Sequence, residues 1–300
     1  MDKLETMRIF VEAADQQSFV AASRSLKLSA PAVSRSIAQL EASLGVRLFN
    51  RTTRHVRLTE PGNRYLVDCK RILEEVAEAE AAVSGSYAAP RGLLSLTAPT
   101  LFGQKHVVPI ITEYLDLYPD VTLRAVFQDR VVNLLEEGFD VAVRIGPLRD
   151  SSFYASKVGT IRRVVCGAPA YLARRGTPQT PADLTDHEII LASAVEPSAT
   201  WRFEADGRKQ AVKLSARLEV SQNGGAIAAA VQGFGLTRVM SYQISEELTA
   251  GSLQVVLQPF ESDPVSVSII HLEGRQANAK VRAFVNLAVD RLRANSVLND

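Results

Sequence analysis

The stretch that decides the fold runs from Ser18 to Leu58 and begins SFVAASRSLKLSAPAVSRSIAQLE, residues 18–41. It predicts two short helices separated by a tight turn, and a basic hairpin follows them. A helix-turn-helix with such a wing places its second helix in the major groove of DNA. The N-terminal part of the chain is therefore predicted to bind double-stranded DNA.

The second helix of the pair is marked by its start and by its two faces. Ser29 is a suitable N-cap, and Pro31 lies in the first turn, where its missing N–H costs nothing. One apolar stripe is formed by Val33, Ile37, Leu40 and Leu44. The opposite face carries the small or hydrogen-bonding residues Ala32, Ser34, Arg35, Ser36 and Gln39. From this helix we expect DNA contacts by Ser29, Ala30, Pro31, Ser34, Arg35 and Gln39.

The hairpin and the local charge support the same interpretation. Val46, Leu48, Val56 and Leu58 have the spacing of half-buried strands. Arg51 and Arg54, in and beside the turn, are expected to contact the phosphate backbone. The whole chain carries a net charge of only +1, but residues 24–64 hold eight basic and two acidic side chains. The alternative is a solvated helical bundle with one basic face.

A long helix is predicted after the hairpin. Thr59 is a suitable N-cap, Pro61 lies in the first turn, and the helix is expected to reach about Ser84. A heptad-like seam is formed by Tyr65, Cys69, Ile72, Val76, Ala79 and Val83. The helix either packs on its own domain or pairs with a second copy. We favour pairing, because a helix between two domains has little local core to bury against.

Composition sets the remaining bounds. Three hundred residues suit about two domains. No apolar run is long enough to span a membrane, and the first residues lack the apolar stretch of a signal peptide, so a cytoplasmic protein without membrane contact is expected. Cys69 and Cys166 are too few for a disulfide framework and are expected to act as small buried side chains. No motif indicates a metal or a cofactor, and Asp186, His187 and Glu188 cannot converge from one strand on one ion.

From Leu93 onward, strands and helices alternate, which predicts an α/β domain with a parallel-rich sheet. Ligands of such domains bind at the carboxyl ends of strands. Several expected loops and helix starts lie at such ends. They supply the candidate ligand-binding residues Pro99, Thr100, Leu101, Phe102, Arg144, Gly146, Trp201, Asn223 and Gly224. Backbone N–H groups at Thr100 are expected to suit an anion. Trp201 is equally compatible with a place in the core, and Arg144 with a surface ion pair.

The chain also resembles a known family. Residues 18–23, 30–35, 40–41, 44–51 and 58–62 are similar to the N-terminal signature of LysR-type transcriptional regulators, closely over about the first sixty-five residues. The family often has Gln where this chain has Ala30, so direct reading by an amide is absent there and Ser34 and Arg35 carry more of it. The resemblance implies linker helices paired antiparallel in a dimer. It also implies a two-lobed effector domain similar to periplasmic binding proteins, with the loops named above around the cleft between its lobes.

The expected architecture is α/β overall. A winged helix-turn-helix domain spans residues 1–59 and a linker helix residues 60–90. An effector-binding domain spans 91–300, with one lobe at about 91–162 and 266–300 and the other at about 163–265. The expected function is transcription regulation by a homodimer or homotetramer. Its binding to promoter DNA, or the bend that it imposes on that DNA, is expected to respond to a small organic effector, with anions among the candidates. Two alternatives remain open: a DNA-binding protein whose second domain only builds the oligomer, and an enzyme or transport-type binder with an incidental basic N-terminus.

Overall fold

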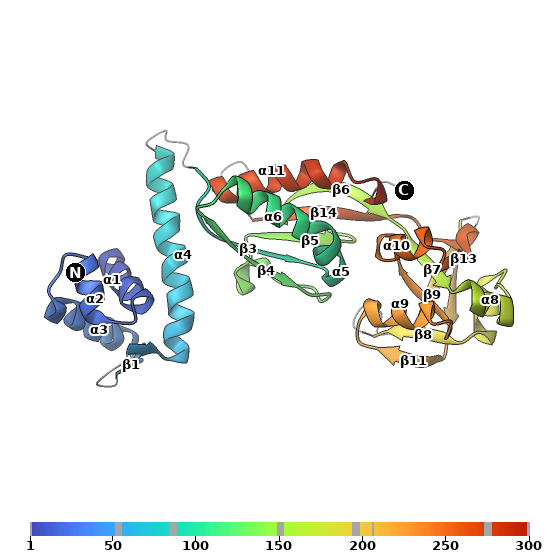
Figure 1. The fold of residues 1–300 in the computed structure, drawn as a ribbon, viewed down its shortest axis with the longest axis horizontal. Coiled ribbons are helices and arrows are strands. Elements are labelled where there is room, and N and C mark those ends of the chain that lie inside the picture. The colour runs from blue at the N-terminus through green and yellow to red at the C-terminus, as the bar shows by residue number, and fades with distance from the viewer. Residues whose placement is uncertain are drawn as a thin grey trace. The chain divides into compact units, whose positions relative to one another are not determined.

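The structure is a computed structural model, and it describes residues 2–51, 56–83, 89–148, 153–193, 199–205, 207–272 and 278–298. The chain divides into two compact units, Met1–Ala88 and Ala89–Asp300. Figure 1 labels the helices and strands of both units. An N-terminal helical unit with a small hairpin precedes an α/β unit with two sheets, so the predicted fold class is confirmed.

The N-terminal unit contains four helices and a two-stranded hairpin. They are α1 (Lys3–Asp15), α2 (Phe19–Ser25), α3 (Ala30–Leu44), β1 (Phe49–Arg51), β2 (Val56–Leu58) and α4 (Glu60–Val83). The first three helices begin as their sequences indicate. The side chains of Asp2, Ser18 and Ser29 accept hydrogen bonds from backbone N–H groups of the first turns.

The core of this unit is aromatic at its centre. The ring of Phe10 is fully buried, and its centroid lies 5.4 Å from that of Phe49 and 5.2 Å from that of Tyr65. Val33, Ile37 and Leu40 of α3 join this core, as predicted. The fourth position of the stripe differs: Leu44 is 41% exposed, because the helix ends there at Gly45 and extends past the core.

The first half of α4 packs on its own domain, which corrects the sequence-based expectation for it. Cys69 is fully buried in the core of the N-terminal unit, and four further side chains of α4 pack against that core. These are Tyr65, Leu66, Ile72 and Leu73. The local core is thus larger than the seam argument assumed, since α1 runs beside α4. Val76 is half-buried and lies one turn beyond these contacts.

The hairpin is attached to the helices by polar contacts. The Glu41 carboxylate accepts hydrogen bonds from the backbone N–H groups of Leu48 (2.8 Å) and Phe49 (3.0 Å). Thr59 caps α4 as predicted, since its hydroxyl accepts from the Gly62 N–H at 3.0 Å. It also donates to the Arg47 carbonyl at 2.7 Å. Glu41, one of the two acidic residues within 24–64, thus fixes the start of the wing.

Gly62 is a point where α4 and the hairpin approach too closely for a side chain. A Cβ at this position would lie 2.1 Å from the carbonyl oxygen of Leu48. Gly62→Ala should therefore lower the free energy of unfolding of the N-terminal unit by about 1–3 kcal/mol, because backbone must shift. Thermal melting would measure the loss against Arg64→Ala, an exposed substitution in the same turn. Equal melting of the two variants would contradict the packing described.

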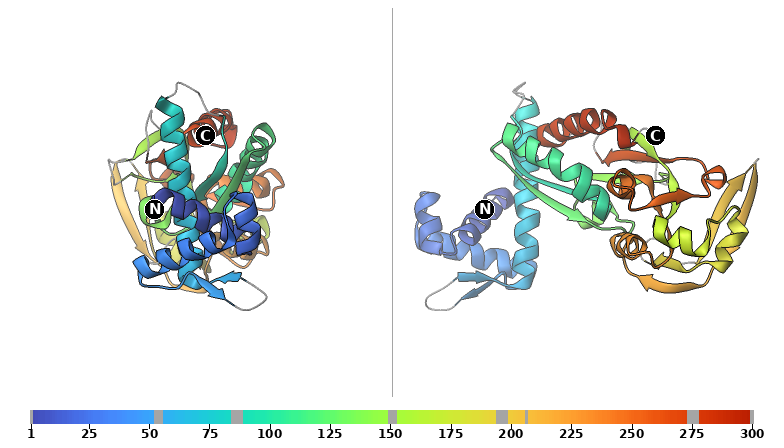
Figure 2. Two further views of the ribbon diagram at one scale, coloured as in Figure 1. Left: turned by 90° about the vertical axis from the view of Figure 1, so that its left-hand side faces the viewer. Right: turned by 45° about the vertical axis from the view of Figure 1, so that its right-hand side comes forward.

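The first lobe of the C-terminal unit holds a five-stranded sheet of order β4-β3-β5-β14-β6. Its strands are β3 (Gly92–Ala98), β4 (Val121–Phe127), β5 (Val141–Ile145), β6 (Tyr154–Ile161) and β14 (Val265–His271). Its helices are α5 (Thr100–Phe102), the π-helix η1 (Gly103–Val107), α6 (Val108–Leu117), α7 (Leu134–Glu137), α11 (Ala279–Arg293) and η5 (Ser296–Leu298). Helices α6 and α11 cover one face (Figure 2). The segment around α7 packs on the other.

The second lobe holds the sheet β11-β8-β12-β7-β13 and a separate hairpin of β9 and β10. Its strands are β7 (Arg163–Gly167), β8 (Ile189–Ala192), β9 (Thr200–Ala205), β10 (Arg208–Lys213), β11 (Ala216–Val220), β12 (Leu236–Met240) and β13 (Gln254–Val256). Its helices are α8 (Pro169–Arg175), η2 (Pro181–Asp186), α9 (Asn223–Val231), η3 (Ser241–Ile244), α10 (Ser245–Thr249) and η4 (Gln258–Phe260). Helix α9 covers one face, and the β9–β10 hairpin with α8 covers the other.

The two lobes of this unit are joined twice by the chain and meet through side chains. The chain passes from β6 to β7 and returns from β13 to β14, which pairs antiparallel with β5 and β6. The ring of Phe102 contacts that of Tyr242 with centroids 5.2 Å apart. Lys105 forms an ion pair with Glu246 at 3.0 Å. The segment after β3 in one lobe therefore rests on the segment after β12 in the other.

Candidate nucleic-acid interface and ligand pocket

Helix α3 presents a polar face away from the core. Arg35 and Gln39 are exposed, while Val33, Ile37 and Leu40 of the same helix are buried. The helix is fixed at its start by the Ser29 hydroxyl, which accepts from the Ala32 N–H at 3.3 Å. An exposed guanidinium and an exposed amide near the start of such a helix can bond to base edges and phosphates.

The other predicted DNA contacts are placed as follows. Ser29 and Pro31 are exposed, and Ala30 and Ser34 are half-buried. Ser36 does not belong to the exposed face: it is 2% exposed, because it lies beside Ile37 on the side of the helix that meets the core. The Arg51 backbone belongs to β1, and the Arg54 prediction lies outside the described residues.

Positive charge surrounds this helix within the N-terminal unit. Arg24 and Lys27 on and after α2, and Arg47 and Arg57 at the hairpin, are all exposed. The Glu41 carboxylate is directed at the backbone of the hairpin, as described above. The described surface near α3 is thus strongly basic, which suits a polyanion.

In the first lobe, the loop after β3 already holds an anionic group of the protein. The Asp129 carboxylate accepts a hydrogen bond from the Thr100 N–H at 2.9 Å. The Thr100 N–H, which was expected to hold an anionic ligand, is therefore already hydrogen-bonded to a carboxylate of the protein. Pro99 and Leu101 are half-buried. Phe102 is fully buried in the lobe core, and its ring contacts Tyr242 of the second lobe, so its part in ligand binding stays a prediction.

The other candidates of the first lobe are also held by its own structure. The Arg144 guanidinium donates to the Val132 carbonyl, and burial lowers the pKa of this arginine. Gly146 has φ of +112°, a conformation that favours glycine, and its N–H donates to the Ser266 carbonyl at 2.9 Å. These contacts give both residues structural roles at the end of β5.

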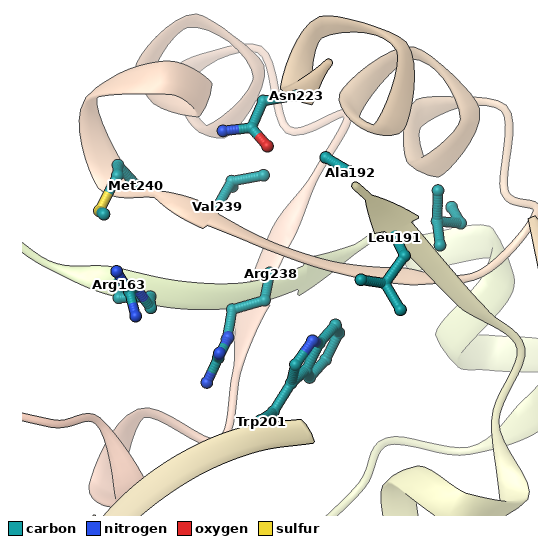
Figure 3. Close-up of a pocket in the computed structure, with 9 residues that line it drawn as sticks. Arg163, Leu191, Ala192, Trp201, Asn223, Arg238, Val239 and Met240 are labelled. Atoms are coloured by element: carbon teal, nitrogen blue, oxygen red, sulfur yellow. The ribbon is translucent and has the colours of Figure 1, made fainter. Parts of the chain in front are cut away.

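A pocket lies in the second lobe where two parallel strands separate. Strands β8 and β12 pair at Ile189–Leu236 and Ile190–Thr237, and their ladder then ends within the described part of the sheet. The pocket lies at the carboxyl ends of both strands, and Figure 3 shows Trp201 from β9 on one side of it and Asn223 of α9 on the other. The lining residues are Arg163, Ile190, Leu191, Ala192, Trp201, Asn223, Arg238, Val239 and Met240.

The structure therefore brings Trp201 and Asn223 together, and it adds two arginines that the sequence reasoning missed. Gly224 is exposed at the start of α9 and is not among the lining residues. A signal for Arg238 was available: a charged residue within the strand Leu236–Met240, which is otherwise apolar or nearly so, needs a specific partner or ligand. Arg163 gave no such signal, since it stands at the start of its strand.

The charged and aromatic groups of the pocket are stacked. The Arg238 guanidinium lies 5.3 Å from the centroid of the Trp201 ring and 5.9 Å from that of Phe203 (Figure 3 shows the first pair). Arg238 is only 9% exposed and donates to the Arg202 carbonyl at 3.0 Å. Trp201 is 1% exposed, and its indole N–H has no hydrogen-bond partner among the described residues.

Gln243 connects this pocket with the contact between the lobes. Its buried amide oxygen accepts from the Asn223 side chain and from the Met240 N–H, each at 3.0 Å. Its amide nitrogen donates to the hydroxyl of Tyr242 at 3.3 Å. Hydrogen bonds through Gln243 thus link Asn223 and Met240 with Tyr242, which packs on Phe102 of the first lobe.

Acidification should weaken this contact between the lobes through His106. Burial and Lys105 lower the pKa of His106, which packs on Phe102 and Tyr242. The unfolded chain therefore takes up the proton first. The contribution of neutral His106 to folding stability is fully present above the ordinary histidine pKa of about 6.5, and it is lost as the pH falls from there towards the pKa in the folded chain. The melting temperature should drop between about pH 7.5 and pH 5.5, and this drop should be smaller in His106→Gln than in the parent chain. Identical pH dependence would contradict this role.

The remaining chemistry of the chain is sparse. Cys69 and Cys166 are free and buried, as predicted, and burial raises the pKa of Cys166 to about 12. Within the described ranges, no group of three or more His, Cys, Asp or Glu side chains is placed to hold a metal ion. Every helix in the described part of the chain is too short or too polar to cross a bilayer.

Two family models match the chain. Residues 4–63 match the model described as a bacterial regulatory helix-turn-helix protein of the lysR family. Residues 88–293 match the model described as the LysR substrate binding domain. The first match lies within the N-terminal unit and ends near the start of α4, and the second covers nearly all of the C-terminal unit.

Known proteins are similar over nearly the whole length. A regulator of Escherichia coli K12, the uncharacterized HTH-type YhjC, is 31% identical over 95% of this chain and 96% of its own. The E. coli transcriptional activator AaeR is 29% identical over 97% and 94%. Among solved structures, CrgA of Neisseria meningitidis, a LysR-type regulator, matches with a TM-score of 0.62 at 29% identity, covering 98% of this chain and 100% of that one. The full-length Vibrio cholerae virulence activator AphB matches with a TM-score of 0.62 at 25% identity, covering 96% and 99%.

Proposed function

Because the chain belongs to the LysR family of transcriptional regulators, which are DNA-binding proteins and not enzymes, we propose that α3 reads promoter DNA and that a small effector in the C-terminal unit modulates this binding. The observation that carries the proposal is the polar face of α3. Arg35 and Gln39 stand exposed on it, within a basic surface and opposite a buried apolar stripe. The protein acts where the chromosome is, in the cytoplasm.

The contacts divide into two kinds. Ser29, Pro31, Ser34, Arg35 and Gln39 contact the major groove and the adjacent phosphates, and Ala30 offers only its methyl group. Arg47, Arg57 and the other arginines of the hairpin, Arg51 and Arg54, follow the phosphate backbone and add affinity without sequence preference. Specificity then rests chiefly on Arg35 and Gln39, whose side chains can form paired hydrogen bonds with guanine and adenine.

A homo-oligomer presents two such helices to one DNA site. The part of α4 beyond its contacts with the N-terminal core, from Val76 onward, is the surface that we assign to a second copy. Two recognition helices on one dimer read two half-sites, whose spacing is fixed by the assembly. A tetramer extends the same arrangement through the C-terminal units.

The effector acts by favouring one arrangement of the lobes. Its pocket, bounded by Trp201 and Asn223, connects through Gln243 with the contact between Tyr242 and Phe102. A ligand that binds two arrangements unequally shifts their populations, and the DNA-binding units of the oligomer follow.

Fluorescence anisotropy with DNA from immediately upstream of the protein's own gene tests DNA reading. The purified chain should bind this DNA much more tightly than a shuffled duplex of equal composition at the same salt concentration, by a factor of about 10³ or more. A screen of metabolites by thermal shift, followed by repeated anisotropy, tests modulation. A chain that binds both duplexes equally would overturn the first part, and stabilising ligands that leave DNA affinity unchanged would overturn the second.

A further inference from the structure

We propose that the pocket between β8 and β12 binds the carboxylate of a small organic acid, with Arg163, Arg238 and the indole N–H of Trp201 as its donors. This inference rests on the proposed function and names the class of effector. The pocket opens where the β8–β12 ladder ends, so strand backbone that would normally be paired borders the site instead. Ligands of open α/β sheets bind at such places, beyond the carboxyl ends of strands.

The charge of the lining points to an anion. Two of the nine lining residues are arginines, and the others carry no charge. Arg238 is 9% exposed, so its head group belongs to the wall of the pocket and is held in place there. Guanidinium groups in a pocket wall form strong, charge-assisted hydrogen bonds with a bound carboxylate.

Trp201 gives an independent sign of a ligand. Its side chain is almost completely buried, and its N–H finds no acceptor in the described part of the chain. Buried indole N–H groups are normally hydrogen-bonded. The Arg238 guanidinium lies over the Trp201 ring at the pocket (Figure 3), so a bound carboxylate could reach both the guanidinium and the indole N–H.

The size and the apolar wall distinguish an organic acid from phosphate. The cavity has a volume of about 50 Å³. Since about 10–15 Å³ holds one water, it takes roughly four groups of that size. Leu191, Val239 and Met240 line it with hydrocarbon, which would leave the outer oxygens of a phosphate without partners. A carboxylic acid with a short apolar body would contact the arginines with its carboxylate and the hydrocarbon side chains with its body.

The single tryptophan of the chain makes the test direct, because Trp201 is the reporter. The full-length protein is titrated with acetate and propionate, and with acetamide and propionamide as neutral controls, at constant ionic strength. The carboxylates should change the tryptophan fluorescence in a saturable manner, and the amides should not. Arg163→Gln and Arg238→Gln should each lower the affinity for the carboxylates by about tenfold or more. Arg217→Gln, an exposed arginine of β11 outside the pocket, should leave them unchanged.

A second variant keeps the proposal testable if Arg238→Gln does not fold. Trp201→Phe keeps an aromatic ring beside Arg238 but removes the N–H together with part of a buried side chain, so its melting temperature without ligand should fall. Measured from that lower starting value, the further stabilisation by propionate should be smaller than in the parent chain. Equal responses to acid and amide, or full carboxylate affinity in Arg163→Gln, would overturn the inference. Carboxylates that bind through Arg163 without altering DNA affinity would support the inference and count against effector modulation. A neutral metabolite that alters DNA affinity, while carboxylates fail to bind, would support effector modulation and overturn the inference of a carboxylate site.

Discussion

Val76→Glu should break the pairing through α4, which would take a dimer to monomers or a tetramer to dimers, and should lower the affinity for operator DNA by about 10²–10⁴-fold. Val76 is half-buried on the face of α4 that packs on the N-terminal core, but it lies beyond the residues that make those contacts. A second copy is what we expect to cover it. Glutamate there would bury a charge in the pair, and each DNA-binding unit would then bind its half-site alone.

Val67→Glu is the matched control for this prediction. Val67 stands on the opposite face of the same helix and is 54% exposed, so the same substitution should leave the dimer intact. Sedimentation velocity gives the oligomeric state of each variant, and anisotropy gives its affinity for DNA. A dimer that survives Val76→Glu and dissociates with Val67→Glu would place the pairing surface on the other side of α4.

Arg35→Ala should reduce the affinity for the operator by about 1–3 kcal/mol and relax its preference at one base position. Arg35 is exposed on the polar face of α3, and a bidentate bond from arginine to guanine contributes about this much discrimination. Because the side chain is exposed and the core lies on the opposite face, melting of the N-terminal unit should change little.

Arg57→Ala provides the contrast. Arg57 is exposed on β2 of the hairpin, where we expect a phosphate contact. Its loss should weaken binding to all sequences alike and reduce the slope of log affinity against log salt concentration by about one. Titrations of operator and shuffled DNA across salt concentrations separate the two effects. Equal, sequence-independent losses in both variants would remove Arg35 from the set of reading residues.

The N-terminal unit was largely predictable because its signals are local. Capping at Ser18 and Ser29, and Pro31 in a first turn, depend on neighbours within a few residues. The buried positions Val33, Ile37 and Leu40 follow from helical periodicity alone. Periodicity cannot say where a core ends, which is why Leu44 is exposed and Ser36 is buried against expectation.

The long helix shows a limit of pattern reasoning. A seam of apolar residues indicates that one face of α4 is covered, but it does not identify what covers it. Tyr65 and Cys69 pack on the N-terminal core, so the seam serves its own domain first. Only the tertiary contact with α1 distinguishes this from pairing along the whole helix.

In the C-terminal unit, the strands β6, β9, β10 and β11 were not anticipated. Strand β10, Arg208–Lys213, is mostly polar and exposed, and it is a strand because it pairs with β9. The candidate ligand residues near Thr100 and Arg144 followed the rule of strand ends but could not reveal the competing partners Asp129 and Val132. The pocket itself depends on the separation of β8 from β12, which no local sequence signal encodes.

Hydroxyl-radical footprinting of the full-length protein on its own upstream DNA tests the central claim most directly. Paired recognition helices predict two protected half-sites on one face of the duplex, with centres separated by one or more helical turns of about 10–10.5 base pairs. Weakened protection of both half-sites in Arg35→Ala should accompany this pattern. A single protected segment, or protection that is the same on shuffled DNA, would contradict it.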